Sequence, residues 1–437
     1  MTEENLKRVH TGMSWKQWAL LVVSAGILVA LGWAWGAIAV RDRAFPYHEV
    51  RALLGRPDSN RRDVRAQIPD LSSLKSLGYL NTSFDERSDQ RGVIDHDAAR
   101  AHAGINLYGS RDLTEAALID MTGRVLHEWR GSGERTGWQH LELLPDGRLL
   151  ATVKDSHIEM RDLDSSLLWR LRIRAHHDLS VADGSIWLNT RVSRVVPEVH
   201  PTEQVTDDLI TEISLDGEIV SEWSVLDAML ASPYRFLLRN LAGPALEPPA
   251  EPADLLHTNH VQVIDAPGGS HAAFAPGNFL LSMRNINAIA VFDRETHAPL
   301  WLWGPGILTF QHHPTLLSNG SVLLFDNGRS RSRVIEVAPD TGAIGWIYKD
   351  PDFFSRRRGS AQRLPNGNTL ITESDSGWVF EVTPKAETVW SFANPRVDAK
   401  GSRSAIWRMV RLPADFASAW ASASNSQPAT RSRELAR

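Results

Sequence analysis

The stretch FQHHPTLLSNGSVLLFDNGRSRSR, residues Phe310–Arg333, contains the pattern that decides the fold of the chain. A short apolar strand precedes a Ser-Asn-Gly turn, and a second apolar strand follows it. Asn-Gly supplies the positive φ angles that a two-residue β-hairpin requires. The chain continues through a second turn, APDTGAIGWIY at Ala338–Tyr348, into a strand that contains tryptophan. The whole pattern predicts one small antiparallel sheet.

The same pattern recurs between about 104 and 412. The first turn appears as LPDG, VADG, LSNG and LPNG, at residues 144–147, 181–184, 317–320 and 364–367. A closing tryptophan appears six times, as Trp129, Trp169, Trp223, Trp303, Trp346 and Trp390. The spacings of these tryptophans are 40, 54, 80, 43 and 44 residues, and the two long intervals hold insertions at about 190–208 and 226–256. A four-stranded repeat of about 40–45 residues is typical of the blades of a β-propeller.

Six tryptophans predict six blades, and five of these are continuous segments of the chain. The segments are about 138–170, 174–224, 255–303, 310–347 and 358–391. The sixth blade must be shared, because residues 104–130 lack an inner strand and IWRMVRLPADF at Ile406–Phe416 resembles an inner strand alone. Pairing the two closes the ring and removes the open sheet edges. We therefore predict an all-β, six-bladed propeller over 104–416, with the tryptophans packed between blades.

An uncharged run of 22 residues, ALLVVSAGILVALGWAWGAIAV at Ala19–Val40, precedes the repeat. A helix needs roughly 20 apolar residues to cross a bilayer, and tryptophans at the ends of the run suit the membrane interface. A cleavable signal peptide is the alternative. The run is longer than the usual apolar region of such a peptide, and no small-x-small cleavage site follows it. The sequence thus predicts a short tail over 1–18 and a single transmembrane helix over 19–40.

Flanking charge leaves the orientation of this helix open, because arginines follow the span in greater number than basic residues precede it. Residues 41–103 form a polar linker, and the leucine spacing at Asp70–Leu80 predicts a short helix within it. Residues 417–437, rich in Ala, Ser and Arg, are expected to form a disordered tail. We expect a single-pass protein of the inner (cytoplasmic) membrane with its propeller on the periplasmic side.

Composition excludes several classes of function. The net charge of −5 provides no basic stripe for nucleic acid, which needs its phosphates neutralised. Cysteine is absent, so disulfides, thiol catalysis and cysteine-ligated metals are excluded.

Histidines recur at one position of the repeat, just before the inner strands. They are His140, the doublet His176-His177, His257, and the doublet His312-His313. Three of them lie seven residues before a turn glycine. Inner strands line the central channel of a propeller, so equivalent positions on successive blades converge near its axis. Because neighbouring strand residues face opposite sides, we expect one histidine of each doublet to reach the channel.

Two further motifs point to the same channel. In DLLHTNHVQVID at Asp254–Asp265, His257 and Asn259 share a face at i, i+2, and SMRN at Ser282–Asn285 places Arg284 one strand later. Imidazoles together with a guanidinium favour a tetrahedral oxyanion such as sulfate or phosphate. A surface or inter-blade salt bridge is the alternative for Arg284. For Asp326-Asn327-Gly328 we favour a loop-stabilising Asx turn over a catalytic role.

The motifs HHD, D-x-x-H-x-N, S-x-R and QH followed by LFDNG occur in one order on one six-bladed propeller, and over about 104–412 the chain resembles the bacterial arylsulfate sulfotransferases. The resemblance implies a transferase that moves a sulfuryl group from an aryl sulfate ester to a phenolic or other hydroxyl acceptor in the periplasm, with no nucleotide donor and no cofactor. It implies a sulfohistidine intermediate on His312. It also implies that His257, Arg284 and His177 or His176 hold the sulfuryl group, supported by Asn259.

We further expect His140 and His313, as histidines of the channel, to contact the substrate. The chain departs from well-studied members of the family because it lacks their N-terminal β-sandwich domain and disulfide. His313 also stands where an acidic residue often follows QH. These departures bear on the identity of the substrate more than on the reaction.

Three alternative functions are open. A non-catalytic membrane-anchored scaffold does not need clustered channel histidines. A quinoprotein-like propeller needs a carboxylate-rich calcium site and commonly a vicinal disulfide, which this cysteine-free chain cannot form. A metal ion held by imidazoles is the third alternative, and we expect no metal because Arg284 would repel a cation.

Overall fold

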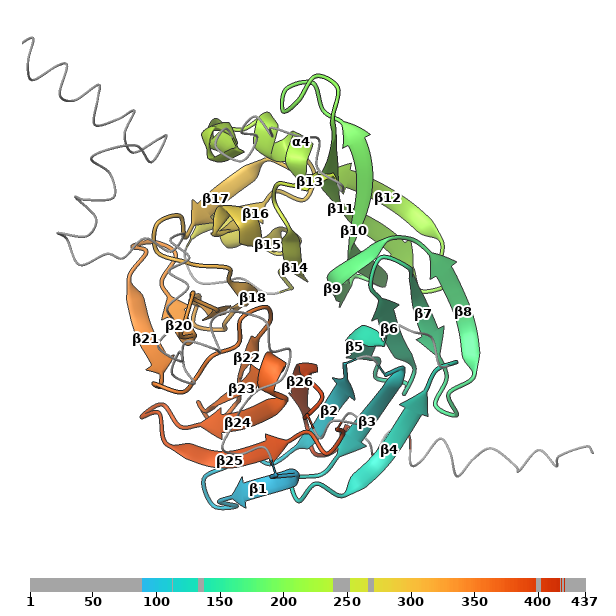
Figure 1. Ribbon diagram of the computed structural model, residues 1–437, viewed down its shortest axis with the longest axis vertical. Helices are drawn as coiled ribbons and strands as arrows, with labels where there is room; N and C mark the ends of the chain where they lie inside the picture. The colour runs from blue at the N-terminus through green and yellow to red at the C-terminus, as the bar shows by residue number, and fades with distance from the viewer. Residues whose placement is uncertain are drawn as a thin grey trace, which may run out of the picture. The chain divides into compact units, whose positions relative to one another are not determined.

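The computed structural model describes residues 89–111, 113–132, 137–238, 252–265, 271–397, 402–416, 418 and 420. These residues form six antiparallel sheets around a central axis, which confirms the predicted all-β, six-bladed propeller (Figure 1). The strands β5, β9, β14, β18, β22 and β26 lie innermost, and the other strands of each sheet lie progressively further from the axis. Six inner strands therefore surround one channel.

Three of the blades are built from four consecutive strands each. They are β5 (Trp138–Leu143), β6 (Leu149–Val153), β7 (His157–Arg161) and β8 (Leu167–Arg172); β14 (Thr258–Val263), β15 (Phe279–Met283), β16 (Ala288–Phe292) and β17 (Pro299–Trp303); and β18 (His312–Leu316), β19 (Val322–Asp326), β20 (Arg333–Val337) and β21 (Ile344–Lys349). The short 3-10 helices η3 (Ala272–Phe274) and η4 (Arg284–Ile286) connect strands of the second of these blades.

A fourth blade carries both predicted insertions. Its strands are β9 (Ala175–Ala182), β10 (Ser185–Val195), β11 (Gln204–Ser214) and β12 (Ile219–Ser224). The first insertion lengthens β10 and β11 to 11 residues each, paired along their whole length. The second insertion contains α4 (Val225–Leu230), η2 (Pro233–Leu238) and β13 (Ala253–Asp254), and β13 pairs in parallel with β11. This pairing holds Asp254 beside the channel end of the blade.

The fifth blade has an extra strand at its rim. It consists of β22 (Ser360–Arg363), β23 (Thr369–Glu373), β24 (Trp378–Val382) and β25 (Thr388–Ala393), with η5 (Ser374–Ser376) between β23 and β24 and with β1 (Gly92–His96) paired to β25. Strand β1 lies inside the range 41–103, for which the sequence predicted only a linker. It covers the outer edge that β25 would otherwise expose.

The sixth blade joins the two ends of the repeat, as the sequence predicted. Strand β26 (Ile406–Leu412) pairs antiparallel with β2 (Ile105–Ser110), which is followed by β3 (Glu115–Ile119) and β4 (Val125–Arg130). Gly104 allows the close approach, because a Cβ there would lie 2.5 Å from the carbonyl oxygen of Leu412. Closure leaves no inner strand unpaired in the ring.

Tryptophans pack between neighbouring blades, as expected, and three of the six closing tryptophans also link blades through the indole nitrogen. Trp169, Trp346 and Trp390 donate Nε1–H to carbonyl oxygens in the turns of the next blade, each at 2.9 Å. In the blade β14–β17 the same bond is made by Trp301, at 3.2 Å to Pro339, and not by the predicted Trp303. A hydrogen-bonded indole satisfies its polar atom while its ring fills the gap between sheets.

Three predicted segments lie wholly or mostly outside the described residues: the helix over 19–40, the short helix over 70–80 and the tail over 417–437. Within the described part of the chain, no helix is long and apolar enough to cross a membrane. Trp420, within the range predicted as a disordered tail, is instead buried, with its ring 5.9 Å from that of Trp129.

Candidate active site

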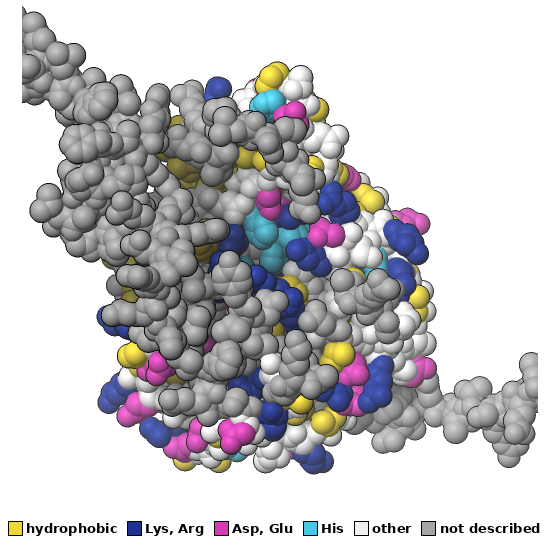
Figure 2. Space-filling view, in the orientation of Figure 1, with side chains coloured by type: hydrophobic (Ala, Val, Ile, Leu, Met, Phe, Trp, Pro, Cys, Tyr) yellow, Lys and Arg dark blue, Asp and Glu magenta, His cyan; other side chains and the backbone are white. Residues whose placement is uncertain are grey.

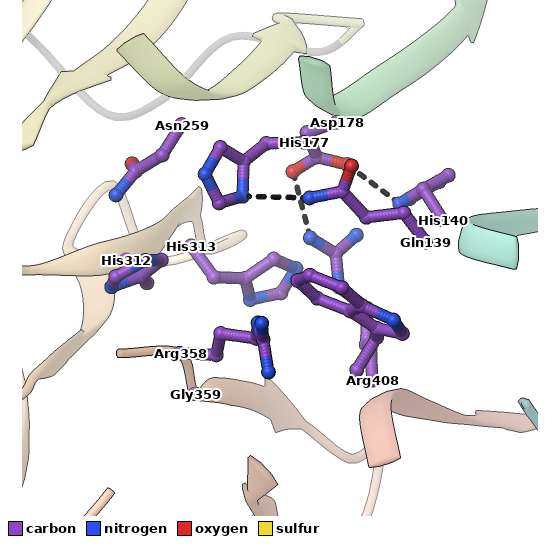
Figure 3. Close-up of a pocket in the computed structure, with 11 residues that line it drawn as sticks. Gln139, His140, His177, Asp178, Asn259, His312, His313, Arg358, Gly359 and Arg408 are labelled. Atoms are coloured by element: carbon purple, nitrogen blue, oxygen red, sulfur yellow. Dashed lines mark hydrogen bonds and ion pairs between the residues drawn. The ribbon is translucent and has the colours of Figure 1, made fainter. Parts of the chain in front are cut away.

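The inner strands and the residues just before them surround a small polar cavity on the axis (Figure 3). Its lining residues are Gln139, His140, His177, Asp178, Asn259, His312, His313, Arg358, Gly359, Trp407 and Arg408. The cavity volume of about 30 Å³ exceeds the ~10–15 Å³ that a buried water needs and is far below the ~150 Å³ of a cavity that binds benzene. The cavity therefore suits a small polar group and excludes an aromatic ring.

His312 lines this cavity, and only one of its ring nitrogens is hydrogen-bonded within the described part of the chain. Its Nδ1 lies 2.7 Å from Oδ1 of Asn327 and 3.0 Å from the carbonyl oxygen of Phe310, and both oxygens are acceptors. Nδ1 must therefore carry the hydrogen. Nε2 is buried and has no hydrogen-bond partner among the described residues. The tautomer with a lone pair on Nε2, which a nucleophile needs, is thus fixed by the surrounding chain.

Asn327 is oriented by its own neighbours. Its Nδ2 donates to the carbonyl oxygens of Ser355, at 2.7 Å, and Arg358, at 2.9 Å, so its Oδ1 must face His312. The sequence analysis assigned this residue to an Asx turn, and the structure shows that its side chain positions His312 instead. The Asp-Asn-Gly sequence that follows the QH motif was the feature from which this positioning role could have been predicted.

The environment keeps His312 neutral. Burial lowers its pKa to about 3, the charge of Arg284 acts in the same direction, and the contact with Asn327 opposes them only in part. Arg284 is not among the residues that line the cavity. Its guanidinium stacks on Phe310 instead, with the guanidinium carbon 4.3 Å from the centre of the ring. Its hydrogen bond goes to Oδ1 of Asn285, at 3.0 Å. Arg284 therefore lies outside the set of lining residues, and its contact with a channel ligand stays a prediction.

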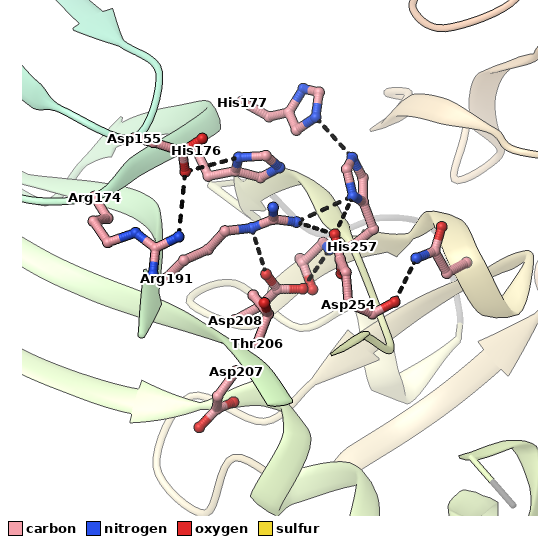
Figure 4. Close-up of polar contacts among 12 residues, drawn as sticks. Asp155, Arg174, His176, His177, Arg191, Thr206, Asp207, Asp208, Asp254 and His257 are labelled. Atoms are coloured by element: carbon pink, nitrogen blue, oxygen red, sulfur yellow. Dashed lines mark hydrogen bonds and ion pairs between the residues drawn. The ribbon is translucent and has the colours of Figure 1, made fainter. Parts of the chain in front are cut away.

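A chain of polar contacts runs from the cavity wall to two carboxylates (Figure 4). Nε2 of His177 lies 3.1 Å from Nε2 of His257, and Nδ1 of His257 donates to Asp254 at 2.5 Å. Arg191 donates to Asp254 at 2.9 Å and to Asp208 at 3.0 Å. The sequence placed His257 and Asn259 together, and the structure puts Asn259 in the cavity wall and His257 one contact behind it.

The doublet His176-His177 divides between two environments. His177 lines the cavity and receives a 3.3 Å contact on Nδ1 from Nε2 of Gln139. His176 is fully buried, does not line the cavity, and stacks edge-on against His177 with 4.2 Å between ring centres. One histidine of this doublet reaches the channel, as expected.

The doublet His312-His313 behaves differently, because both of its histidines line the cavity. His313 has a φ of 51°, in the left-handed region, and the pairing of β18 with β19 shifts register just after His312. The alternation of side chains that the sequence analysis assumed holds only for regular strands, so the prediction of one inward histidine was wrong here. Nδ1 of His313 lies 3.1 Å from the carbonyl oxygen of Ala361. Because a carbonyl oxygen only accepts hydrogen bonds, His313 is the donor.

Asp178 joins four blades at the opposite wall. Its carboxylate accepts from His140 Nδ1 at 2.8 Å, from Arg408 at 2.7 Å and from His260. These partners come from β5, β26 and β14, and Asp178 itself lies on β9. Burial alone would raise the pKa of Asp178, but the charge of Arg408 and the facing histidines hold it well below the usual value. His140 thus serves an ion-pair network as well as the cavity wall.

Several lining residues were not predicted from the sequence, among them Gln139, Gly359 and three larger side chains. Arg408 and Trp407 come from the closing strand β26, and Arg358 precedes β22, with its guanidinium carbon 3.5 Å from the centre of the Trp407 ring. Figure 2 shows histidine side chains at the middle of one face with basic side chains around them. Basic groups and neutral imidazoles around a cavity of this size suit a small anion.

Burial of these imidazoles makes stability depend on pH. Burial lowers the pKa of His176, His177, His312 and His313. A histidine with a lowered pKa binds more protons once the chain unfolds, so stability falls as pH drops below about 6.5 towards the folded value. His140 changes the stability in the opposite direction, because the charge of Asp178 raises the pKa of His140 against the effect of burial.

We expect the free energy of unfolding in urea to fall between pH 6.5 and 4.5, by about 1.4 kcal/mol per pH unit for each histidine held neutral. His313→Asn keeps a donor for the Ala361 carbonyl but does not titrate, so its slope should be shallower by about that amount. The same change at exposed His96 is the control, with an unaltered slope. If the free energy of unfolding fell equally steeply with pH in wild type and His313→Asn, a lowered pKa of His313 would be contradicted.

Comparison with known proteins points to one family. The family model described as Arylsulfotransferase (ASST) matches residues 140–395. No curated protein matches the chain. Similar solved structures include a Bacteroides caccae protein of unknown function (12% identity, 70% of this chain and 98% of that chain, TM-score 0.44) and a streptogramin B lyase (11%, 76% and 96%, 0.43). The WD40 propeller domain of Doa1 is a third (12%, 70% and 79%, 0.40). With TM-scores this low, nothing about the chain is inferred from them.

Proposed function

Because the chain belongs to the arylsulfotransferase family, we propose that it transfers a sulfuryl group from an aryl sulfate ester to a phenolic or other hydroxyl acceptor through a sulfohistidine at His312. The observation that carries the proposal is the state of the His312 ring. Its Nδ1 hydrogen is fixed by two acceptors, the ring lines the polar cavity, and its buried Nε2 has no hydrogen-bond partner among the described residues. No accessory group has to remove a proton before this nitrogen can attack.

In the first step, Nε2 of His312 attacks sulfur while the bond from sulfur to the aryl oxygen breaks. The product is a sulfohistidine, and the aryl oxygen leaves with the bonding electron pair. The cavity accepts the sulfuryl end of the ester only, so the aromatic ring stays at the mouth. Arg358 and Asn259 line the space beside His312 and are placed to meet the sulfuryl oxygens.

The proton of the reaction is assigned to the pair His177–His257. Burial keeps His177 neutral, so the departing phenolate takes its proton from water at the mouth of the cavity. In the second step the acceptor hydroxyl gives its proton to the pair, its oxygen attacks sulfur, and the bond from nitrogen to sulfur breaks. The pair then gives this proton to the hydroxide left by the first step, so the pair and His312 end as they began.

The test is transfer from 4-nitrophenyl sulfate to phenol by the full chain purified in detergent. We expect nitrophenol release to depend on the acceptor, with ping-pong kinetics, and aryl sulfate product to form in equal amount. No release with a panel of hydroxyl acceptors, from a chain shown to be folded, would favour the non-catalytic scaffold.

Replacing Asn327 with alanine removes one of the two acceptors that hold His312 Nδ1. The carbonyl of Phe310 remains 3.0 Å away, so the tautomer is weakened but not lost. We expect kcat to fall on the order of 10–100-fold with KM nearly constant, since the change affects orientation and not binding. Steady-state kinetics with 4-nitrophenyl sulfate measure both values.

The matched control is Asn319→Ala, in the exposed turn of the same blade, which should keep wild-type kinetics. A rise in KM with constant kcat in Asn327→Ala would assign Asn327 to substrate binding instead. Equal loss of kcat in both variants would show a general effect on the blade.

A further inference from the structure

Three histidines, one in the cavity wall and two behind it, lie close together. The ring nitrogens of His176, His177 and His257 include one atom from each that lie within 4.8 Å of one another. We propose that these three residues form a zinc-binding site, and that zinc bound there inhibits sulfuryl transfer. The inhibition rests on the proposed function, because His177 and His257 are the pair assigned to proton transfer. The binding itself does not depend on that function.

The spacing of the nitrogens fits a tetrahedral ion. Zinc binds imidazole nitrogen at about 2.0–2.1 Å, which separates two tetrahedral ligands by about 3.3–3.4 Å. Nε2 of His177 and Nε2 of His257 are 3.1 Å apart, so an ion fits between them after a shift of a few tenths of an ångström. Three histidines leave a fourth position open for water or an anion.

His176 supplies an observation that the fold alone does not explain. Its side chain is 0% exposed, and neither ring nitrogen has a hydrogen-bond partner among the described residues. Its Nδ1 lies 3.9 Å from the carboxylate of Asp155, too far for a hydrogen bond. A buried polar group without a partner costs free energy, which a metal ion bound to one of these nitrogens would recover.

The groups that contact the other ring nitrogens of these histidines also resemble those around a bound metal. Histidines that bind metals usually donate their other N–H to a carboxylate or carbonyl, which orients the ring. His257 does so to Asp254 at 2.5 Å, leaving Nε2 for the ion. His177 faces Gln139, whose Oε1 is buried without a partner. Rotation of this amide lets Gln139 accept Nδ1–H of His177 and frees Nε2 of His177 as a ligand.

Local charge does not oppose a cation. The sequence favoured an anion over a metal because of Arg284, but that guanidinium stacks on Phe310, next to His312. The guanidinium near the three histidines belongs to Arg191, and it is paired with two carboxylates, Asp208 and Asp254 (Figure 4). Arg174 and Lys154 also act on His176, and each lies within 4.0 Å of the Asp155 carboxylate. Three carboxylates thus face these three cations, and the local charge does not oppose a divalent ion.

The experiment is titration of the full chain, purified without a histidine tag and treated with EDTA, with zinc chloride against a chromophoric zinc indicator. We expect one zinc per chain at this site and an affinity at least 100-fold weaker in His176→Leu. His96→Leu, at an exposed histidine of β1, should bind as wild type. Circular dichroism establishes that each variant is folded.

A second variant keeps the result decisive if His176→Leu does not fold. Asp254→Asn leaves all three ligands and should weaken zinc binding by about 10–100-fold. No zinc binding by the wild-type chain, or binding unchanged in both variants, overturns the site.

Inhibition is measured separately. Zinc should block sulfuryl transfer in wild type over the range in which it binds, and EDTA should restore transfer. Binding without inhibition overturns the regulatory part of the proposal. A chain that binds zinc in the predicted way but transfers no sulfuryl group without zinc overturns the proposed function and leaves the metal site standing.

Discussion

His312→Ala should lose sulfuryl transfer from 4-nitrophenyl sulfate, with kcat reduced on the order of 10⁴-fold or more. The reaction divides into two displacements only if a nucleophile holds the sulfuryl group between them, and alanine provides none. Removal of a nucleophile elsewhere has cost about 10⁶-fold in kcat, with residual rate from the remaining binding groups. The remaining cavity groups, such as Arg358 and Asn259, can still bind the ester, so KM should change far less than kcat.

The intermediate gives a second readout. After mixing with donor and quenching in alkali, wild-type protein should gain the mass of one sulfuryl group on the peptide that contains His312. His96→Ala, at an exposed histidine, should be labelled and active as wild type. Label on another histidine, or turnover by His312→Ala within tenfold of wild type, would remove His312 from the mechanism.

Asp178→Asn should destabilise the propeller by about 3–5 kcal/mol, the usual cost of removing one member of a buried ion pair. The carboxylate is 1% exposed and accepts from His140, His260 and Arg408. An amide keeps the shape but leaves the Arg408 charge without its counterion. Urea denaturation followed by tryptophan fluorescence measures the difference.

Asp183→Asn is the matched control, because Asp183 follows the same strand, is 68% exposed and pairs with Arg294 at 3.2 Å. Its loss should be below about 0.5–1 kcal/mol, as for exposed ion pairs. Equal stability of Asp178→Asn and wild type would show that the carboxylate network does not hold the four blades together.

Local patterns predicted most of the fold. Asn-Gly and Asp-Gly turns, alternating apolar strands and a tryptophan at a fixed period each depend on a few neighbouring residues, so they can be read from one chain. The sequence could not show whether Trp301 or Trp303 bonds to the next blade. Residues two apart on a strand share a face, and both tryptophans fit the period. Strand β1 has no repeat of its own, and its only partner is β25, almost 300 residues away.

The candidate site was predictable only in outline. Repetition placed histidines near the axis, but His177, His257 and His313 all have φ between 50° and 60°, in the left-handed region. This conformation breaks the alternation from which inward and outward residues are deduced. Asn327 lies in a sequence typical of a turn and also positions His312, and the residue type alone cannot distinguish these two roles. Arg408 meets Asp178 across 230 residues, a contact that only the closed ring creates.

Closure by the last strand sets the order in which the enzyme becomes complete during synthesis. Trp407 and Arg408 line the cavity from β26, near the end of the propeller, whereas β2 is among its first strands to leave the ribosome. Until residue 412 has emerged, β2 has no inner neighbour and the cavity lacks one wall. A nascent chain that extends past His312 but not through β26 therefore lacks part of the cavity wall, and the proposed sulfuryl transfer requires the two ends of the propeller to have met.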